Sequence, residues 1–125
     1  MLRTDSFSTT ARIVFLLTLV VVLLLALSPV RFLQELDMGF TFQHDKLNHA
    51  AAFAVLAALG SLGWPEHKTR LVVLLALTGA AIELLQGAQL IARDMDILDW
   101  VADCAGMACG LAAIGGTRRL IGGLL

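Results

Sequence analysis

Long apolar runs alternate with short polar connections along the chain. The runs cover residues 13–30, 47–64, 71–92 and 100–117. Each is at least 18 residues long, and a helix of that length measures about 27 Å, enough to cross the hydrocarbon core of a bilayer. No segment alternates apolar and polar residues as a strand does, and a membrane barrel needs about eight strands or more. The pattern therefore predicts an all-α, polytopic membrane protein built as a four-helix transmembrane bundle.

The composition supports a membrane protein. Hydrophobic residues make up 58% and charged residues 15% of the 125 residues, whereas soluble domains average about 45–50% and about 25%. The net charge of −1 says nothing about nucleic acid, but no Lys/Arg cluster provides a basic surface along which phosphates could bind. A cleaved signal peptide is the alternative interpretation of the first run, but Pro29 directly follows the candidate cleavage site. We therefore favour an uncleaved anchor.

Basic residues indicate the orientation of the helices. The N-terminus, the second connection and the C-terminus carry six of them: Arg3, Arg12, Lys68, Arg70, Arg118 and Arg119. The first and third connections carry only three, and they also hold most of the acids. Because cytoplasmic segments are enriched in Lys and Arg, we expect both termini in the cytoplasm. The predicted parts are a cytoplasmic N-terminal segment (1–12), the transmembrane domain (13–117) and a cytoplasmic tail (118–125).

Three ionisable residues interrupt the apolar runs near their predicted outer ends. His49 lies in the first turn of the second run, Glu83 about 18 Å along the third and Asp103 about 9 Å into the fourth. Charged groups are costly inside a membrane and by default mark a functional site. Since lipid offers carboxylates no partner, we expect an outward-facing polar pocket walled by the second, third and fourth helices.

Helical spacing adds further residues to this predicted pocket. Asp96, Asp99 and Asp103 share one helix face with a Gly106-x-x-x-Gly110 pattern, which is typical of close helix contacts. The predicted ligand-binding residues are Asp45, Lys46, His49, Glu83, Gln86, Arg93, Asp96, Asp99 and Asp103.

Structural alternatives remain open for these residues. Glu83 and Gln86 could only form hydrogen bonds between helices, and Asp96 could simply cap the fourth helix. The acids and His49 are of types that suit a divalent cation, but their spacing is not diagnostic, so we predict neither a metal nor a cofactor. The sequence contains no His-Glu-x-x-His zinc motif, no Gly-x-Ser-x-Gly elbow and no phosphate-binding loop.

An ordered set of short motifs resembles VanZ-like membrane proteins. The motifs are Asp45-Lys46-x-x-His49-x-x-x-Phe53, Glu83-x-x-Gln86, Arg93-x-x-Asp96-x-x-Asp99 and Gly106-x-x-x-Gly110. The resemblance covers roughly residues 28–115. One departure concerns Asp103, where the family usually carries Asn.

The resemblance implies a small multi-helix protein of the bacterial cytoplasmic membrane. The namesake of the family is associated with low-level resistance to the glycopeptide teicoplanin. Our leading hypothesis is a non-catalytic envelope protein whose pocket binds a lipid-linked precursor head group or a cationic glycopeptide and contributes to glycopeptide resistance. In this hypothesis, Arg93 pairs with a phosphate or carboxylate of the ligand, and the acidic residues pair with its amines.

Two alternatives belong to other classes of protein. The first is an intramembrane enzyme acting on a lipid-linked substrate, with His49 or Glu83 as general base and Arg93 stabilising an oxyanion or phosphate. The second is an assembly module, in which the polar groups only join helices.

Overall fold

The computed structural model describes residues 2–28, 45–88 and 96–124, and these residues are almost entirely helical. The helices are α1 (Leu2–Ala26), α4 (Asp45–Gly63), α5 (Lys68–Gln86) and α6 (Ile97–Leu124), with a short 3₁₀ turn, η1 (Pro65–His67), between α4 and α5. Within these ranges there is no strand. The predicted all-α class is therefore confirmed.

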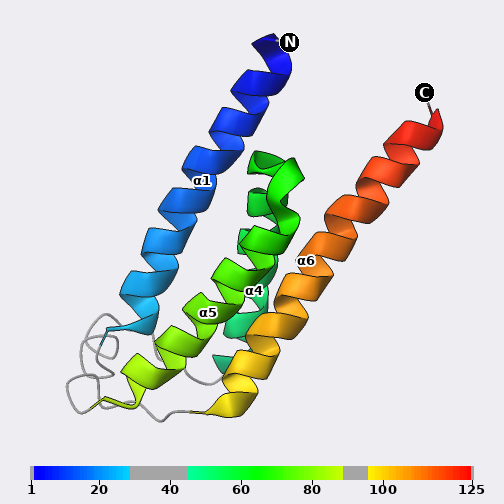
Figure 1. Cartoon of the computed structure of the whole chain (residues 1–125). Helices are drawn as coiled ribbons and strands as arrows, with labels where there is room; N and C mark the ends of the chain where they lie inside the picture. The colour runs from blue at the N-terminus through cyan, green and yellow to red at the C-terminus, as the bar shows by residue number, and fades with distance from the viewer. Residues whose placement is uncertain (1, 29–44, 89–95, 125) are drawn as a thin grey trace.

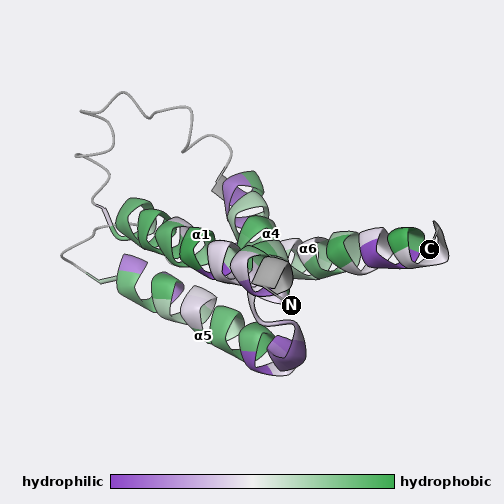
Figure 2. Cartoon of the chain, turned by 90° about the horizontal axis from the view of Figure 1, so that it is seen from above, coloured by the Kyte–Doolittle hydropathy of each residue, from purple (hydrophilic) through white to green (hydrophobic). Residues whose placement is uncertain are grey.

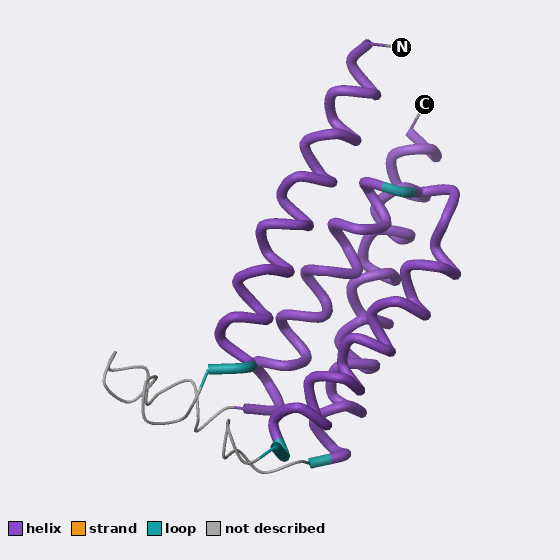
Figure 3. The backbone as a smooth tube through the Cα atoms, turned by 60° about the vertical axis from the view of Figure 1, so that its left-hand side comes forward, coloured by secondary structure: helices purple, strands orange, loops and turns teal. Residues whose placement is uncertain are grey.

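The four helices lie side by side in one bundle (Figure 1). The start of α1, the end of α6 and the η1 turn lie at one end, which we call the terminal end (Figures 1 and 3). The end of α1, the start of α4, the end of α5 and the start of α6 lie at the other, which we call the connection end. Successive helices therefore run in opposite directions.

Three segments are long and apolar enough to cross a membrane: Asp5–Ala26, Pro65–Gln86 and Ile97–Gly123. Large apolar side chains such as Leu17, Leu77 and Leu84 are more than 60% exposed, and hydrophobic residues cover α1 beyond its polar N-terminal turns (Figure 2). Such an apolar exterior suits lipid rather than water. The alanine-rich α4 is not among the three segments.

Helix α4 occupies the centre of the bundle. It contacts α1, α5 and α6, most extensively α6. Its Phe53 and Leu56 are buried with Leu75 of α5 and Phe15 of α1. A helix covered by its neighbours needs fewer large apolar residues than one that faces lipid, which accounts for the composition of α4.

Small residues bring α4 and α6 into close contact. A Cβ atom added at Gly106 would overlap the backbone carbonyl of Ala50, and one added at Gly110 would overlap that of Ala54. The two backbones can approach this closely only because both glycines lack a side chain. The close helix contact predicted for the Gly106-x-x-x-Gly110 pattern is confirmed.

Polar side chains of α1 and α6 satisfy the last carbonyls of α4 at the terminal end. Arg12 Nε donates to the Gly63 carbonyl at 2.7 Å, and Arg118 Nη2 donates to that of Ser61 at 3.3 Å. Cations at a helix C-terminus also complement its dipole. The helices continue through parts of the predicted 1–12 and 118–125 segments, so those boundaries remain predictions about the membrane surface and are not helix ends.

Candidate functional site

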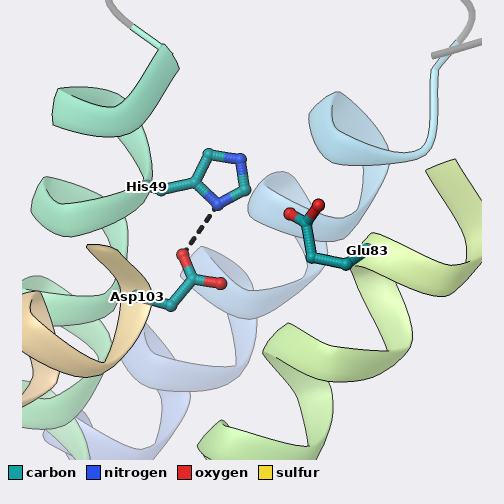
Figure 4. A group of neighbouring side chains, drawn as sticks. All are labelled: His49, Glu83 and Asp103. Carbon is teal, nitrogen blue, oxygen red and sulfur yellow. Dashed lines mark hydrogen bonds and ion pairs between the residues drawn. The ribbon is translucent and has the colours of Figure 1, made fainter. Parts of the chain in front are cut away.

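Three buried ionisable side chains meet near the connection end, and we call them the buried trio: His49 of α4, Glu83 of α5 and Asp103 of α6 (Figure 4). They are 9%, 4% and 0% exposed. One potential ligand atom from each residue lies within 4.8 Å of those of the other two. The side chains from three separate helices therefore form one cluster, and Glu83 faces the bundle interior.

The closest contact in the buried trio joins His49 to Asp103. His49 Nδ1 lies 2.7 Å from Asp103 Oδ1, a distance typical of a charge-assisted hydrogen bond. The glycine contact between α4 and α6 lies about one turn further into the bundle from Asp103. That contact holds the two helices close enough for the side chains to meet.

Glu83 connects the end of α5 to the start of α6. Its Oε2 accepts the backbone N–H of Asp96 at 3.0 Å. Its other oxygen, Oε1, and Oδ2 of Asp103 are buried and have no hydrogen-bond partner among the described residues. Each carboxyl group of the buried trio thus has one oxygen held by a hydrogen bond and one buried oxygen left over.

Gly79 of α5 has no side chain and so leaves room for Asp103 and Trp100 of α6. A Cβ atom at Gly79 would lie 2.8 Å from Asp103 Oδ2 and 3.2 Å from Trp100 Cδ1. The Trp100 indole donates to the Ala76 carbonyl at 3.0 Å and joins α6 to α5. This hydrogen bond is not predicted from the sequence, although Trp100 lies three residues before Asp103 and so shares its helix face.

A second polar layer, which we call the acidic rim, consists of Asp96, Asp99 and Lys46. Lys46 Nζ lies 3.0 Å from Asp96 Oδ2 and 3.4 Å from Asp99 Oδ1. Asp99 is buried, whereas Lys46 is exposed. Together the acidic rim and the buried trio hold four carboxyl groups against one ammonium and one imidazole, so the cluster has an excess of acid.

Asp96 also lies directly before α6. Its Oδ1 accepts the N–H of Leu98 at 2.9 Å, so the predicted capping role is confirmed. The hydrogen bond from Lys46 and then that from Leu98 lower the pKa of Asp96. Hydrogen bonds to Asp96 and Asp99 raise the pKa of Lys46. Both shifts favour the charged forms of the pair at neutral pH.

Gln86 is used to join helices. Its side chain is buried, and Nε2 donates to the Ala26 carbonyl at the end of α1 at 2.9 Å. The alternative of an interhelical hydrogen bond is therefore confirmed for Gln86. The predicted site residue Arg93 lies outside the described residues. Asp45 is the first residue of α4, and its side chain lies outside the described part of the structure.

Two cavities lie at the terminal end, away from the buried trio. One of about 540 Å³ is lined by residues 65–70. The other, of about 580 Å³, lies between α1 and the start of α5 and is lined mainly by apolar side chains including Phe15, Trp64 and Leu71. Neither cavity is lined by His49, Glu83 or Asp103.

Comparison with protein-family models, curated proteins and solved structures finds no match to the chain. The VanZ-like resemblance therefore stays a prediction from the motifs. Function has to be inferred from the chemistry of the buried trio and the acidic rim.

Proposed function

We propose that the chain is a VanZ-like integral protein of the bacterial cytoplasmic membrane that crosses it four times. Three segments have the length and apolarity of membrane spans, and α4, with 19 residues, is about 28 Å long. Basic residues gather at the terminal end, where Arg12 and Arg118 bind carbonyls of α4. Since basic segments stay inside, the terminal end faces the cytoplasm and the acidic rim faces outward.

We infer that the buried trio and the acidic rim bind a positively charged group of an envelope ligand, such as an amine of a cationic glycopeptide. The observation that carries this proposal is the pair of buried carboxylate oxygens, Glu83 Oε1 and Asp103 Oδ2, without a hydrogen-bond partner among the described residues. Burying a polar group without a hydrogen-bond partner costs about 1–3 kcal/mol of free energy. A ligand group that binds these two oxygens therefore offsets that cost. The excess of acid favours an amine over the phosphate of a lipid-linked precursor.

Drug sensitivity of cells that carry the chain tests this function. In a host without its own copy, we expect the wild-type chain to raise the teicoplanin concentration that stops growth. Glu83→Gln and Asp99→Asn should abolish that protection, because each removes a negative charge from the cluster. Glu66→Gln is the matched control, since Glu66 is exposed at the terminal end. Unaltered protection in normally inserted Glu83→Gln and Asp99→Asn variants would refute the proposal.

A second candidate function is catalysis on a lipid-linked substrate. The observation that favours it is the 2.7 Å contact between His49 Nδ1 and Asp103 Oδ1, because a carboxylate that orients an imidazole makes it a better general base. In this reading, His49→Gln eliminates turnover of a lipid-linked precursor by the purified protein. Turnover that survives His49→Gln would remove the candidate.

A further inference from the structure

The buried trio concentrates negative charge where little water reaches it. With His49 neutral and both carboxyl groups ionised, the three side chains carry a charge of −2, while Glu83 and Asp103 are only 4% and 0% exposed. Buried charges persist in proteins when they are paired or bind metals. A protonated His49 would offset only one of these two charges, and Lys46 contacts only the acidic rim among the contacts described.

The donor atoms have the spacing of a single ion site. A nitrogen of His49 and one oxygen each from Glu83 and Asp103 lie within 4.8 Å of one another. Ligands that bind one ion at about 2.0–2.2 Å lie about 3.5 Å apart in tetrahedral geometry, so side-chain movements of about 1 Å close the site. The three side chains approach one another from three helices (Figure 4).

One oxygen of each carboxyl group is held by a hydrogen bond, in one case from the backbone and in the other from His49. The Asp96 N–H binds Glu83 Oε2, and the imidazole binds Asp103 Oδ1. The oxygens left over, Glu83 Oε1 and Asp103 Oδ2, have no hydrogen-bond partner among the described residues. Metal-binding carboxylates are commonly oriented in this manner, with one oxygen hydrogen-bonded and the other available to the ion.

We propose that His49, Glu83 and Asp103 bind one divalent transition-metal ion of the Zn²⁺ type. Two carboxylates and a neutral imidazole balance the charge of the ion, which removes the excess of negative charge from the interior. The imidazole selects Zn²⁺ over Mg²⁺ and Ca²⁺, which prefer all-oxygen sites. Three protein ligands leave a fourth position for water or a ligand group. The inference goes beyond the proposed function, because metal binding needs neither the envelope ligand nor the acidic rim. The ion and the positively charged group of the ligand would compete for Glu83 Oε1 and Asp103 Oδ2, so Zn²⁺ should weaken binding of the ligand.

Titration of the full chain with Zn²⁺ tests the site. The protein is purified in detergent, stripped with a chelator and titrated in a calorimeter, with Mg²⁺ in a parallel run. We expect about one tightly bound Zn²⁺ per chain and a higher melting temperature with Zn²⁺. Glu83→Gln and Asp103→Asn should each weaken binding at least about tenfold. Glu66→Gln, a matched change on an exposed residue at the terminal end, should leave the dissociation constant unchanged.

X-ray absorption of the wild-type protein loaded with Zn²⁺ tests the site without any variant, so the result does not depend on whether a variant folds. It should show nitrogen and oxygen neighbours only. Sulfur neighbours would overturn the proposal by assigning the ion to Cys104 or Cys109. The absence of Zn²⁺ binding would also overturn it, and so would an equal loss of Zn²⁺ affinity in Glu66→Gln and Glu83→Gln. Failed Zn²⁺ binding beside drug protection that depends on Glu83 would refute this inference alone. Zn²⁺ binding without any drug phenotype would refute the proposed function alone.

Discussion

At the scale of single residues, Asp96 joins the two polar layers of the connection end. Its side chain caps α6 and pairs with Lys46, while its backbone N–H binds Glu83. Sequence reasoning could identify Asp96 as a cap or a site residue, because residue type and position are enough for either. Sequence reasoning could not show that Asp96 contacts both the buried trio and the acidic rim. Its N–H contact to Glu83 forms only when α5 and α6 are packed together.

The pair of Lys46 and Asp96 predicts how stability depends on pH. The pKa of Asp96 is lowered from 3.8, so its stabilising contribution is present above that value and is lost as pH falls through the lowered pKa. The pKa of Lys46 is raised from 10.5, so its contribution is present below that value and is lost as pH rises through the raised pKa. The pair therefore stabilises the fold throughout the neutral range.

Melting temperatures of the wild-type chain and of Lys46→Gln test this dependence. The wild type should melt higher at pH 7, and the difference should shrink as Asp96 is protonated in strong acid. Lys68→Gln, a change at the exposed start of α5, serves as the control. A difference that stays constant from pH 7 to strong acid would show that Lys46 acts through something other than this ion pair.

At the scale of helices, the apolar runs predict where helices form but not which neighbours they touch. The runs at 47–64, 71–92 and 100–117 correspond to α4 (Asp45–Gly63), α5 (Lys68–Gln86) and α6 (Ile97–Leu124). Each of these helices begins two or three residues before its run, because backbone hydrogen bonding continues into polar residues, whereas α5 ends at Gln86, before the end of its run. The bonds from Gln86 to Ala26 and from Trp100 to Ala76 could not be predicted, since helical spacing gives a face but not its partner.

The contact between α4 and α6 predicts a sharp contrast between two glycines of one helix. Gly106→Ala should lower the free energy of unfolding by about 1–3 kcal/mol, because the new methyl group overlaps the Ala50 carbonyl. Gly115→Ala should be neutral or stabilising by up to about 1 kcal/mol, since nothing lies within 4 Å of the added atom and alanine favours helix. Denaturation of both variants in detergent measures the contrast. Equal stabilities would mean that α4 and α6 are not in backbone contact.

At the scale of the whole molecule, the antiparallel arrangement places the start of α1, the end of α6 and the η1 turn at one end (Figure 1). The sequence predicts the same grouping from its basic residues alone, because Arg and Lys favour the cytoplasmic side. We expect a fluorescent protein fused to the C-terminus to fluoresce, and alkaline phosphatase fused at the same position to be inactive. An active phosphatase fusion would invert the orientation and turn the acidic rim toward the cytoplasm.

The whole account depends on residues far apart in the chain forming one site in the bundle. His49 and Asp103 are 54 positions apart, and their coupling can be measured with His49→Gln, Asp103→Asn and the double variant. Because residues in contact show coupling energies of about 0.5–3 kcal/mol, the free energies of unfolding in detergent should deviate from additivity by at least about 0.5 kcal/mol. Strictly additive effects would show that the two side chains do not meet, and the buried trio would not exist.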